Sequence, residues 1–181
     1  LENLFIDSSR DAALLRNEPF MAGLAYAAAL GIAEALSLPL LENPWNPDWE
    51  IALLIADGIM NTPREAGFPV YWGEVATVLN RLRGVPPQTT HWDPEEELGL
   101  LIRDNIINSP RKPGDELLWG EFATALNRLR QRDVSPAAWD PAAEIKALLD
   151  DRLLFTPRDI LSRVLWGELA TVLNRYRGVG G

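Results

Sequence analysis

The chain contains no cysteine and a single histidine, His91, among its 181 residues. Disulfides and thiolate metal sites are therefore excluded, and one histidine cannot supply the ligand cluster of a zinc site. Basic residues are also scarce, because 17 lysines and arginines face 26 acidic residues, for a net charge of −9. Nucleic-acid binding depends on a basic face that displaces counterions, so DNA and RNA are poor candidate partners.

No uninterrupted apolar run reaches the roughly 20 residues that a membrane span needs. The most apolar stretch, residues 21–41, is broken by Glu34 and Pro39. Glu2 and Asp7 stand where a signal peptide would carry its positive region, and the first residue is not Met. The 47% of hydrophobic and 24% of charged residues predict a globular chain without membrane insertion. Because it does not begin with Met, we expect it to be a piece of a longer protein.

What the sequence does contain is a repeat. Aligning Trp45, Trp92 and Trp139 gives two equal steps of 47 residues, after which the three copies match without a gap. We divide the chain into residues 1–41, repeat 1 (44–91), repeat 2 (92–138) and repeat 3 (139–181). One such unit cannot bury its own apolar face, so the three copies should pack against each other.

Each copy predicts two helices around an irregular loop. The first helix begins at an N-cap residue followed by a proline, whose fixed φ suits the first helical position; these pairs are Asn46-Pro47, Asp93-Pro94 and Asp140-Pro141. It should end near Gly58 or Asn105, which accept a left-handed backbone, whereas Arg152 holds this place in repeat 3 and predicts a different turn.

The second helix of each copy carries a single apolar stripe and should begin near a tryptophan. It runs to a pair of arginines, which favour the negative helix end; the pairs are Arg81/Arg83, Arg128/Arg130 and Arg175/Arg177. The sequence therefore predicts an all-α fold of three tandem two-helix repeats in a pseudo-threefold arrangement.

These repeats resemble S-layer homology repeats over roughly residues 44–181. The resemblance implies a pseudo-trimer that anchors non-covalently to cell-wall polysaccharide through grooves between repeats. Where that family opens its second helix with Thr-Arg-Ala-Glu, this chain has Tyr71-Trp72-Gly73-Glu74, Leu118-Trp119-Gly120-Glu121 and Leu165-Trp166-Gly167-Glu168. The glutamate is kept in every copy, and a tryptophan replaces the arginine that helps to hold acidic wall sugars in the family. The change affects the expected ligand more than the expected fold.

Residues 1–41 resemble the carboxyl end of zinc-dependent N-acetylmuramoyl-L-alanine amidases. The matching elements are Leu1-Glu2-Asn3-Leu4-Phe5-Ile6-Asp7, then residues 11–15 and a helix that includes residues 27–35. The resemblance implies that one amidase-derived helix precedes the repeats and that Glu2 aligns with the catalytic glutamate. Zinc is expected in the missing catalytic part, and no cofactor or metal in this chain.

Three sets of residues recur as candidate binding residues. The first is Trp72, Trp119 and Trp166, which either anchor the core or line a groove where an indole face stacks on a sugar ring. The second is Arg64, Arg111 and Arg158, which bind a ligand or pair with Glu74, Glu121 and Glu168. The third is Asn80, Asn127 and Asn174, which hydrogen-bond a neighbouring loop's backbone or the ligand. By contrast, we expect Trp45, Trp92 and Trp139 to be packing plugs and the helix-end arginines to be solvated.

No nucleophile constellation, glycine-rich phosphate loop or metal-ligand cluster appears in residues 44–181. The sequence therefore predicts a non-catalytic module that binds a bacterial cell-wall glycan, either peptidoglycan or secondary polysaccharide. It would target a peptidoglycan amidase, an endolysin or autolysin of phage or bacterial origin, to the wall after export or phage lysis. Two alternatives stay open: the chain is part of an active zinc amidase, or the repeats mediate self-association of a lysin.

Overall fold

The fold is known from a computed structural model that describes residues 45–86, 91–135 and 138–179, and seven further positions from Met21 to Ile32. Those seven positions are all helical. The described residues form helices and no strands, apart from three isolated bridges, so the predicted all-α class is confirmed. Glu2 and the amidase-like motif around it lie outside the described residues. None of the described helices is long and apolar enough to cross a bilayer.

Each repeat contributes two helices, as predicted. Repeat 1 forms α3 (Pro47–Ala56) and α4 (Trp72–Leu82), repeat 2 forms α5 (Pro94–Arg103) and α6 (Trp119–Leu129), and repeat 3 forms α7 (Pro141–Asp150) and α8 (Trp166–Tyr176). The side chains of the three predicted N-cap residues accept backbone N–H groups of the first turn, and each is followed by the proline. Cap chemistry therefore sets where the first helices begin.

The turn after the first helix is the same in all three repeats. Gly58 has φ 72°, Asn105 57° and Arg152 58°, so the prediction of a different turn at Arg152 is wrong. A left-handed backbone costs an L-residue without special side chains roughly 1–2 kcal/mol. The packing of the repeat outweighs this local cost and imposes the turn on an arginine.

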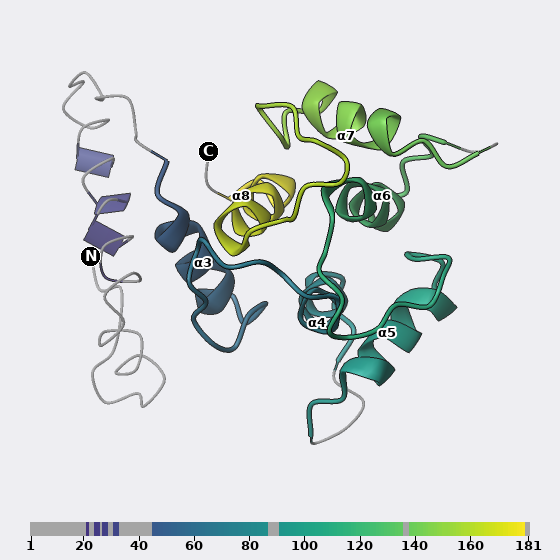
Figure 1. The fold of residues 1–181 in the computed structure, drawn as a ribbon. Coiled ribbons are helices and arrows are strands. Elements are labelled where there is room, and N and C mark those ends of the chain that lie inside the picture. The colour runs from purple at the N-terminus through teal and green to yellow at the C-terminus, as the bar shows by residue number, and fades with distance from the viewer. Residues whose placement is uncertain are drawn as a thin grey trace.

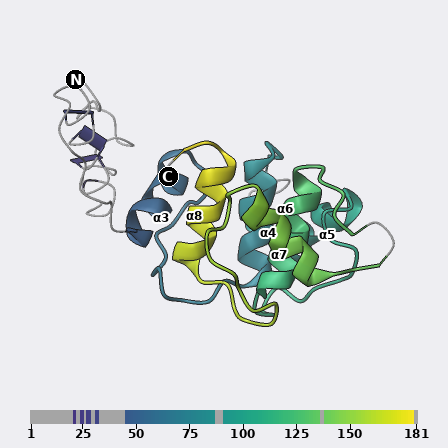
Figure 2. The same cartoon turned by 90° about the horizontal axis from the view of Figure 1, so that it is seen from above.

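The helices pair between repeats. The first helix of each repeat packs on the second helix of the repeat before it, as α5 on α4 and α7 on α6, while α3 packs on α8 and closes the ring. Figures 1 and 2 show these three pairs side by side, with α3 at the start of the described repeats lying against α8 at their end.

The centre of the ring is a triangle of backbone hydrogen bonds. The N–H of Val70 donates to the carbonyl of Val164, that of Val164 to Leu117, and that of Leu117 back to Val70, each over 2.9 Å. All three residues have 0% exposure. Three equivalent bonds that close on themselves define a pseudo-threefold axis, and the predicted arrangement is thereby confirmed.

This packing explains why each Trp-Gly-Glu motif has a glycine at its centre. A Cβ on Gly120 would lie 2.8 Å from the Cβ of Pro141 and 3.2 Å from the carbonyl oxygen of Ile160. The N–H of Gly120 donates to that same carbonyl over 3.0 Å. A Cβ on Gly73 would lie equally close to the Cβ of Pro94, and one on Gly167 would lie still closer to that of Pro47. The next repeat's first helix thus approaches so closely that only glycine fits.

Candidate functional site

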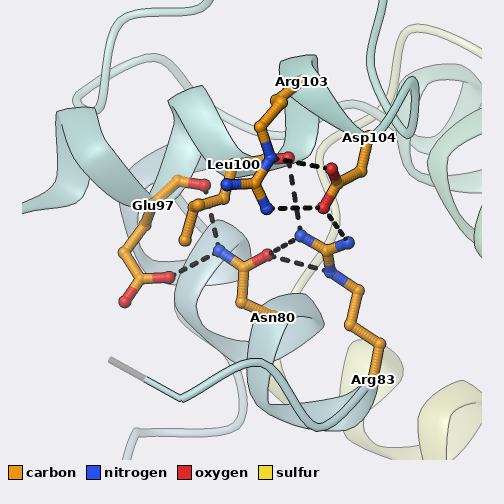
Figure 3. Close-up of polar contacts among 6 residues, drawn as sticks. All are labelled: Asn80, Arg83, Glu97, Leu100, Arg103 and Asp104. Carbon is orange, nitrogen blue, oxygen red and sulfur yellow. Dashed lines mark hydrogen bonds and ion pairs between the residues drawn. The ribbon is translucent and has the colours of Figure 1, made fainter. Parts of the chain in front are cut away.

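A polar cluster joins the helices of each pair, and we call it the interlock; Figure 3 shows the one between α4 and α5. In the pair of α4 and α5, the amide nitrogen of Asn80 donates to the Glu97 carbonyl over 3.0 Å and to its carboxylate over 2.5 Å. Arg83 donates to the amide oxygen of Asn80 over 2.7 Å and pairs with Asp104 over 2.6 Å. Hydrogen bonds from Arg103 and Arg83 hold the pKa of Asp104 well below its usual range.

The interlock recurs at the other two helix pairs. Asn127 donates to Glu144, and Asn174 to Glu50, with 2.6 Å between amide nitrogen and carboxylate in both. Burial raises the pKa of Glu50, while the hydrogen bond from Asn174 and the charge of Arg175 act in the opposite direction.

The three asparagines are at most 1% exposed, and their amide nitrogens reach a carbonyl of the adjoining helix over 2.9–3.0 Å. The predicted bond to a neighbour's backbone is therefore present, although the neighbour is a helix and not a loop. These amides are buried and used within the protein, which removes Asn80, Asn127 and Asn174 from the candidate ligand contacts.

Three grooves recur on the surface at equivalent positions of the repeats, with volumes of about 250 Å³ (groove 1), 270 Å³ (groove 2) and 180 Å³ (groove 3). Groove 1 is lined by Met60, Asn61, Thr62, Arg64, Glu74, Thr77, Val78, Arg81, Trp92 and Trp166. Its body comes from repeat 1, Trp92 from repeat 2 and Trp166 from repeat 3. Grooves 2 and 3 follow the same scheme, so every groove needs all three repeats.

A tryptophan covered by an arginine forms the floor of each groove. Trp166 is 2% exposed, and the guanidinium carbon of Arg64 lies 5.8 Å from its ring centre. The corresponding distances are 5.6 Å for Arg111 over Trp72 and 5.5 Å for Arg158 over Trp119. Each arginine also pairs over 2.7–2.8 Å with the glutamate of the Trp-Gly-Glu motif of its own repeat.

Of the two roles weighed for Trp72, Trp119 and Trp166, the structure supports the core anchor and not the sugar platform. The indoles are core residues at the bottom of the grooves, and a guanidinium already lies on each ring. The arginines combine the two roles weighed for them, ion pairing and groove lining. Each pairs with its glutamate and lines a groove, and about a third or more of its side chain is exposed.

The linker tryptophans form the open wall instead. Trp45, Trp92 and Trp139 are 55%, 61% and 58% exposed, so the expectation that they are packing plugs is wrong. Each indole N–H donates to a threonine hydroxyl in the groove over 2.8–2.9 Å, on Thr171, Thr77 and Thr124 respectively. The bond fixes the ring at the rim and leaves an aromatic face towards solvent. The sequence signal was present, since Thr77 and Thr124 precede their tryptophans by the same 15 residues.

The expectation that the helix-end arginines are solvated is wrong for the second arginine of each pair. Arg83, Arg130 and Arg177 have side chains only 13–16% exposed, and each pairs with an aspartate of the adjoining repeat. The first arginines, Arg81, Arg128 and Arg175, are partly buried and line grooves 1, 2 and 3 respectively. Each groove thus combines two arginines with one glutamate and is locally positive on a chain of net charge −9. Within the described ranges, no three His, Asp or Glu side chains gather into a metal-binding group.

No family model matches the chain, and neither curated proteins nor solved structures provide a match.

Proposed function

We propose that the three repeats bind a bacterial cell-wall glycan and target a peptidoglycan amidase, an endolysin or autolysin, to the wall. The observation that carries this proposal is the repeated pairing of an exposed indole with a guanidinium in a groove, as for Trp92 and Arg64 in groove 1. The apolar C–H face of a sugar ring stacks on an aromatic face, and guanidinium N–H groups bind hydroxyl or carboxylate oxygens around it.

Several grooves around one ring suit a polymer better than a single small molecule. A wall glycan, whether peptidoglycan or secondary polysaccharide, presents the same unit many times. Binding at a second groove then becomes intramolecular, and overall affinity rises without any strong single site. Three shallow grooves of about 180–270 Å³ fit this kind of binding.

The amidase part of the proposal rests on the resemblance of residues 1–41 to the end of zinc amidases. The hydrolytic zinc site would belong to a catalytic region outside this chain, where Glu2 would join it. The repeats would then act at the cell wall, reached by export or by phage lysis, and supply attachment while that region supplies chemistry.

Sedimentation with purified Gram-positive walls tests the proposal. The chain should pellet with the walls, and a variant combining Trp45→Ala, Trp92→Ala and Trp139→Ala should bind more than roughly tenfold more weakly, as expected for loss of aromatic binding anchors. The matched control combines Phe68→Ala and Leu161→Ala, since both are exposed apolar residues that line none of the grooves.

The control should bind as the unchanged chain does. A chain that does not sediment, or a triple variant that binds normally, would contradict the proposal. Walls stripped of secondary polysaccharide then separate the two glycans, because binding is lost only if the polysaccharide is the ligand. Light scattering should show one species at all concentrations, whereas a concentration-dependent oligomer would favour the self-association alternative.

A further inference from the structure

The three grooves differ at one position of their wall. Grooves 1 and 2 carry the exposed amides of Asn61 and Asn108, whereas groove 3 carries Phe155 at the equivalent place. Phe155 is 62% exposed, so the core does not require an aromatic residue here. Groove 3 is also the smallest, with about 180 Å³ against 250 Å³ and 270 Å³.

Phe155 lies directly on Arg175, one of the two arginines of its groove. The guanidinium carbon of Arg175 is 3.9 Å from the centre of the Phe155 ring, close to the contact distance of stacked groups. A cation held against an aromatic face is satisfied by the ring quadrupole and loses access to other partners from that side.

Two of the three nitrogens of Arg175 are further restricted. One terminal nitrogen donates to the carbonyl of Leu153 over 3.3 Å, and the Nε atom is buried without a hydrogen-bond partner. Burial lowers the pKa of Arg175, and the charge of Glu50 opposes this effect. In groove 1, Arg81 makes the corresponding bond to Ile59 over 3.5 Å, but Asn61 stands where the phenyl ring would cover it.

We propose that Phe155, by covering Arg175 and narrowing groove 3, leaves Trp45 and Arg158 without the second guanidinium that grooves 1 and 2 offer, so that the module binds its saccharide through grooves 1 and 2 alone. This inference rests on the proposed function and refines it: Phe155 is a specificity-determining residue that makes the three-repeat ring a two-site binder. An asparagine at this position would restore the wall found in the other grooves, and a phenylalanine in place of Asn108 would close groove 2.

Inorganic phosphate, used as a probe for accessible guanidinium groups, tests the closure without any wall ligand. In NMR spectra of arginine Nε–H groups, rising phosphate should shift the signals of Arg81 and Arg128 and leave that of Arg175 unchanged. In the Phe155→Asn variant the Arg175 signal should shift with the other two. Equal shifts of all three signals in the unchanged chain would overturn the inference.

Calorimetry with short, size-fractionated glycan fragments released by muramidase from polysaccharide-bearing walls tests the number of sites. The unchanged chain should bind two fragments, Phe155→Asn three and Asn108→Phe one. Leu161→Asn, which replaces an exposed apolar residue of repeat 3 outside the grooves, should leave the number at two. Three sites in the unchanged chain, or two in Phe155→Asn, would overturn the inference. If no variant binds fragments, the proposed function fails, and the phosphate experiment alone decides whether Phe155 shields Arg175.

Discussion

The interlocks and the grooves contain similar residues but differ in whether those residues are buried or accessible. Both combine arginine with a carboxylate, and both recur three times around the same ring. In an interlock, Asn80 and Glu97 are buried and bonded to one another, so the polar groups stabilise the helix contact. In a groove, Arg64 and Glu74 are partly exposed beside an open indole face, so their remaining bonding capacity is available. The difference shows that burial, and not residue type, separates the structural polar groups from those available to a ligand.

The largest effect should follow from removing repeat 3. A chain of residues 1–138 leaves α3 without α8 and α6 without α7, and it opens the central hydrogen-bond triangle. Each groove also loses at least one of its walls, so interlocks and grooves should fail together. We expect loss of cooperative thermal unfolding by circular dichroism and collapse of amide dispersion by NMR. A truncated chain that unfolds cooperatively would show that the repeats are independent.

Asn80→Ala should have the next largest effect, because it breaks an interlock and leaves the grooves intact. The buried Glu97 carboxylate loses its amide partner, which should lower the free energy of unfolding by about 2 kcal/mol. Denaturant unfolding measures the loss, and wall binding of the folded variant should be unchanged. Lys146→Ala, which removes an exposed pair with Asp150, is the control and should cost less than about 0.5 kcal/mol.

Glu50→Gln should stabilise the fold in a pH-dependent way. Burial raises the pKa of Glu50 above its ordinary value of 4.5, so the folded state binds this proton more tightly than the unfolded state. The free energy of unfolding then falls as pH rises from 4.5 through the raised pKa. Glutamine keeps an oxygen for Asn174 and avoids the buried charge.

Denaturant unfolding of Glu50→Gln at a series of pH values checks this sign. The variant should be more stable than the unchanged chain at pH 7, and the gap should narrow as pH approaches 4.5. The same substitution at Glu65, which is exposed in the loop of repeat 1, serves as the control and should make little difference. A gap that widens at low pH would contradict the role of burial.

Arg111→Ala should have the smallest effect on stability and a larger one on binding. It removes a partly buried ion pair with Glu121 and the stacking on Trp72, together about 1 kcal/mol. Wall binding should fall by roughly tenfold, because a groove loses its guanidinium donor. If unfolding free energy fell by several kcal/mol while binding persisted, the groove arginines would be structural like the interlock.

Local chemistry made much of the fold predictable. The N-cap and proline pairs located the first helices, and the 47-residue period predicted the threefold packing. The roles of the tryptophans were not predictable in the same way. Trp166 becomes the floor of a groove in repeat 1, and Trp92 its rim, so each contributes to a site built by another repeat. The repeat period shows which residues are equivalent, but it does not show which other repeats those residues contact.

The same reason explains the turn at Arg152. Residue preference predicted a break in the pattern, yet Arg152 adopts the left-handed backbone of Gly58 and Asn105. Leu153 and Leu154, which follow the turn, are buried, and their N–H groups donate to the carbonyl of Leu148. Such packing is invisible to a rule that considers the preference of a single residue.

The contact of α3 with α8 means that the chain could begin with any of the three repeats, provided that their cyclic order is kept. The segments Arg83 to Asp93 and Arg130 to Asp140 are eleven residues each, and joining Gly181 directly to Leu41 would connect Arg177 to Asn46 through the same length. A circularly permuted chain, joined there and cut within either natural linker, would keep all three helix pairs. Such a ring has no first repeat, and its topology would allow a fused catalytic domain to be attached at any of three equivalent places.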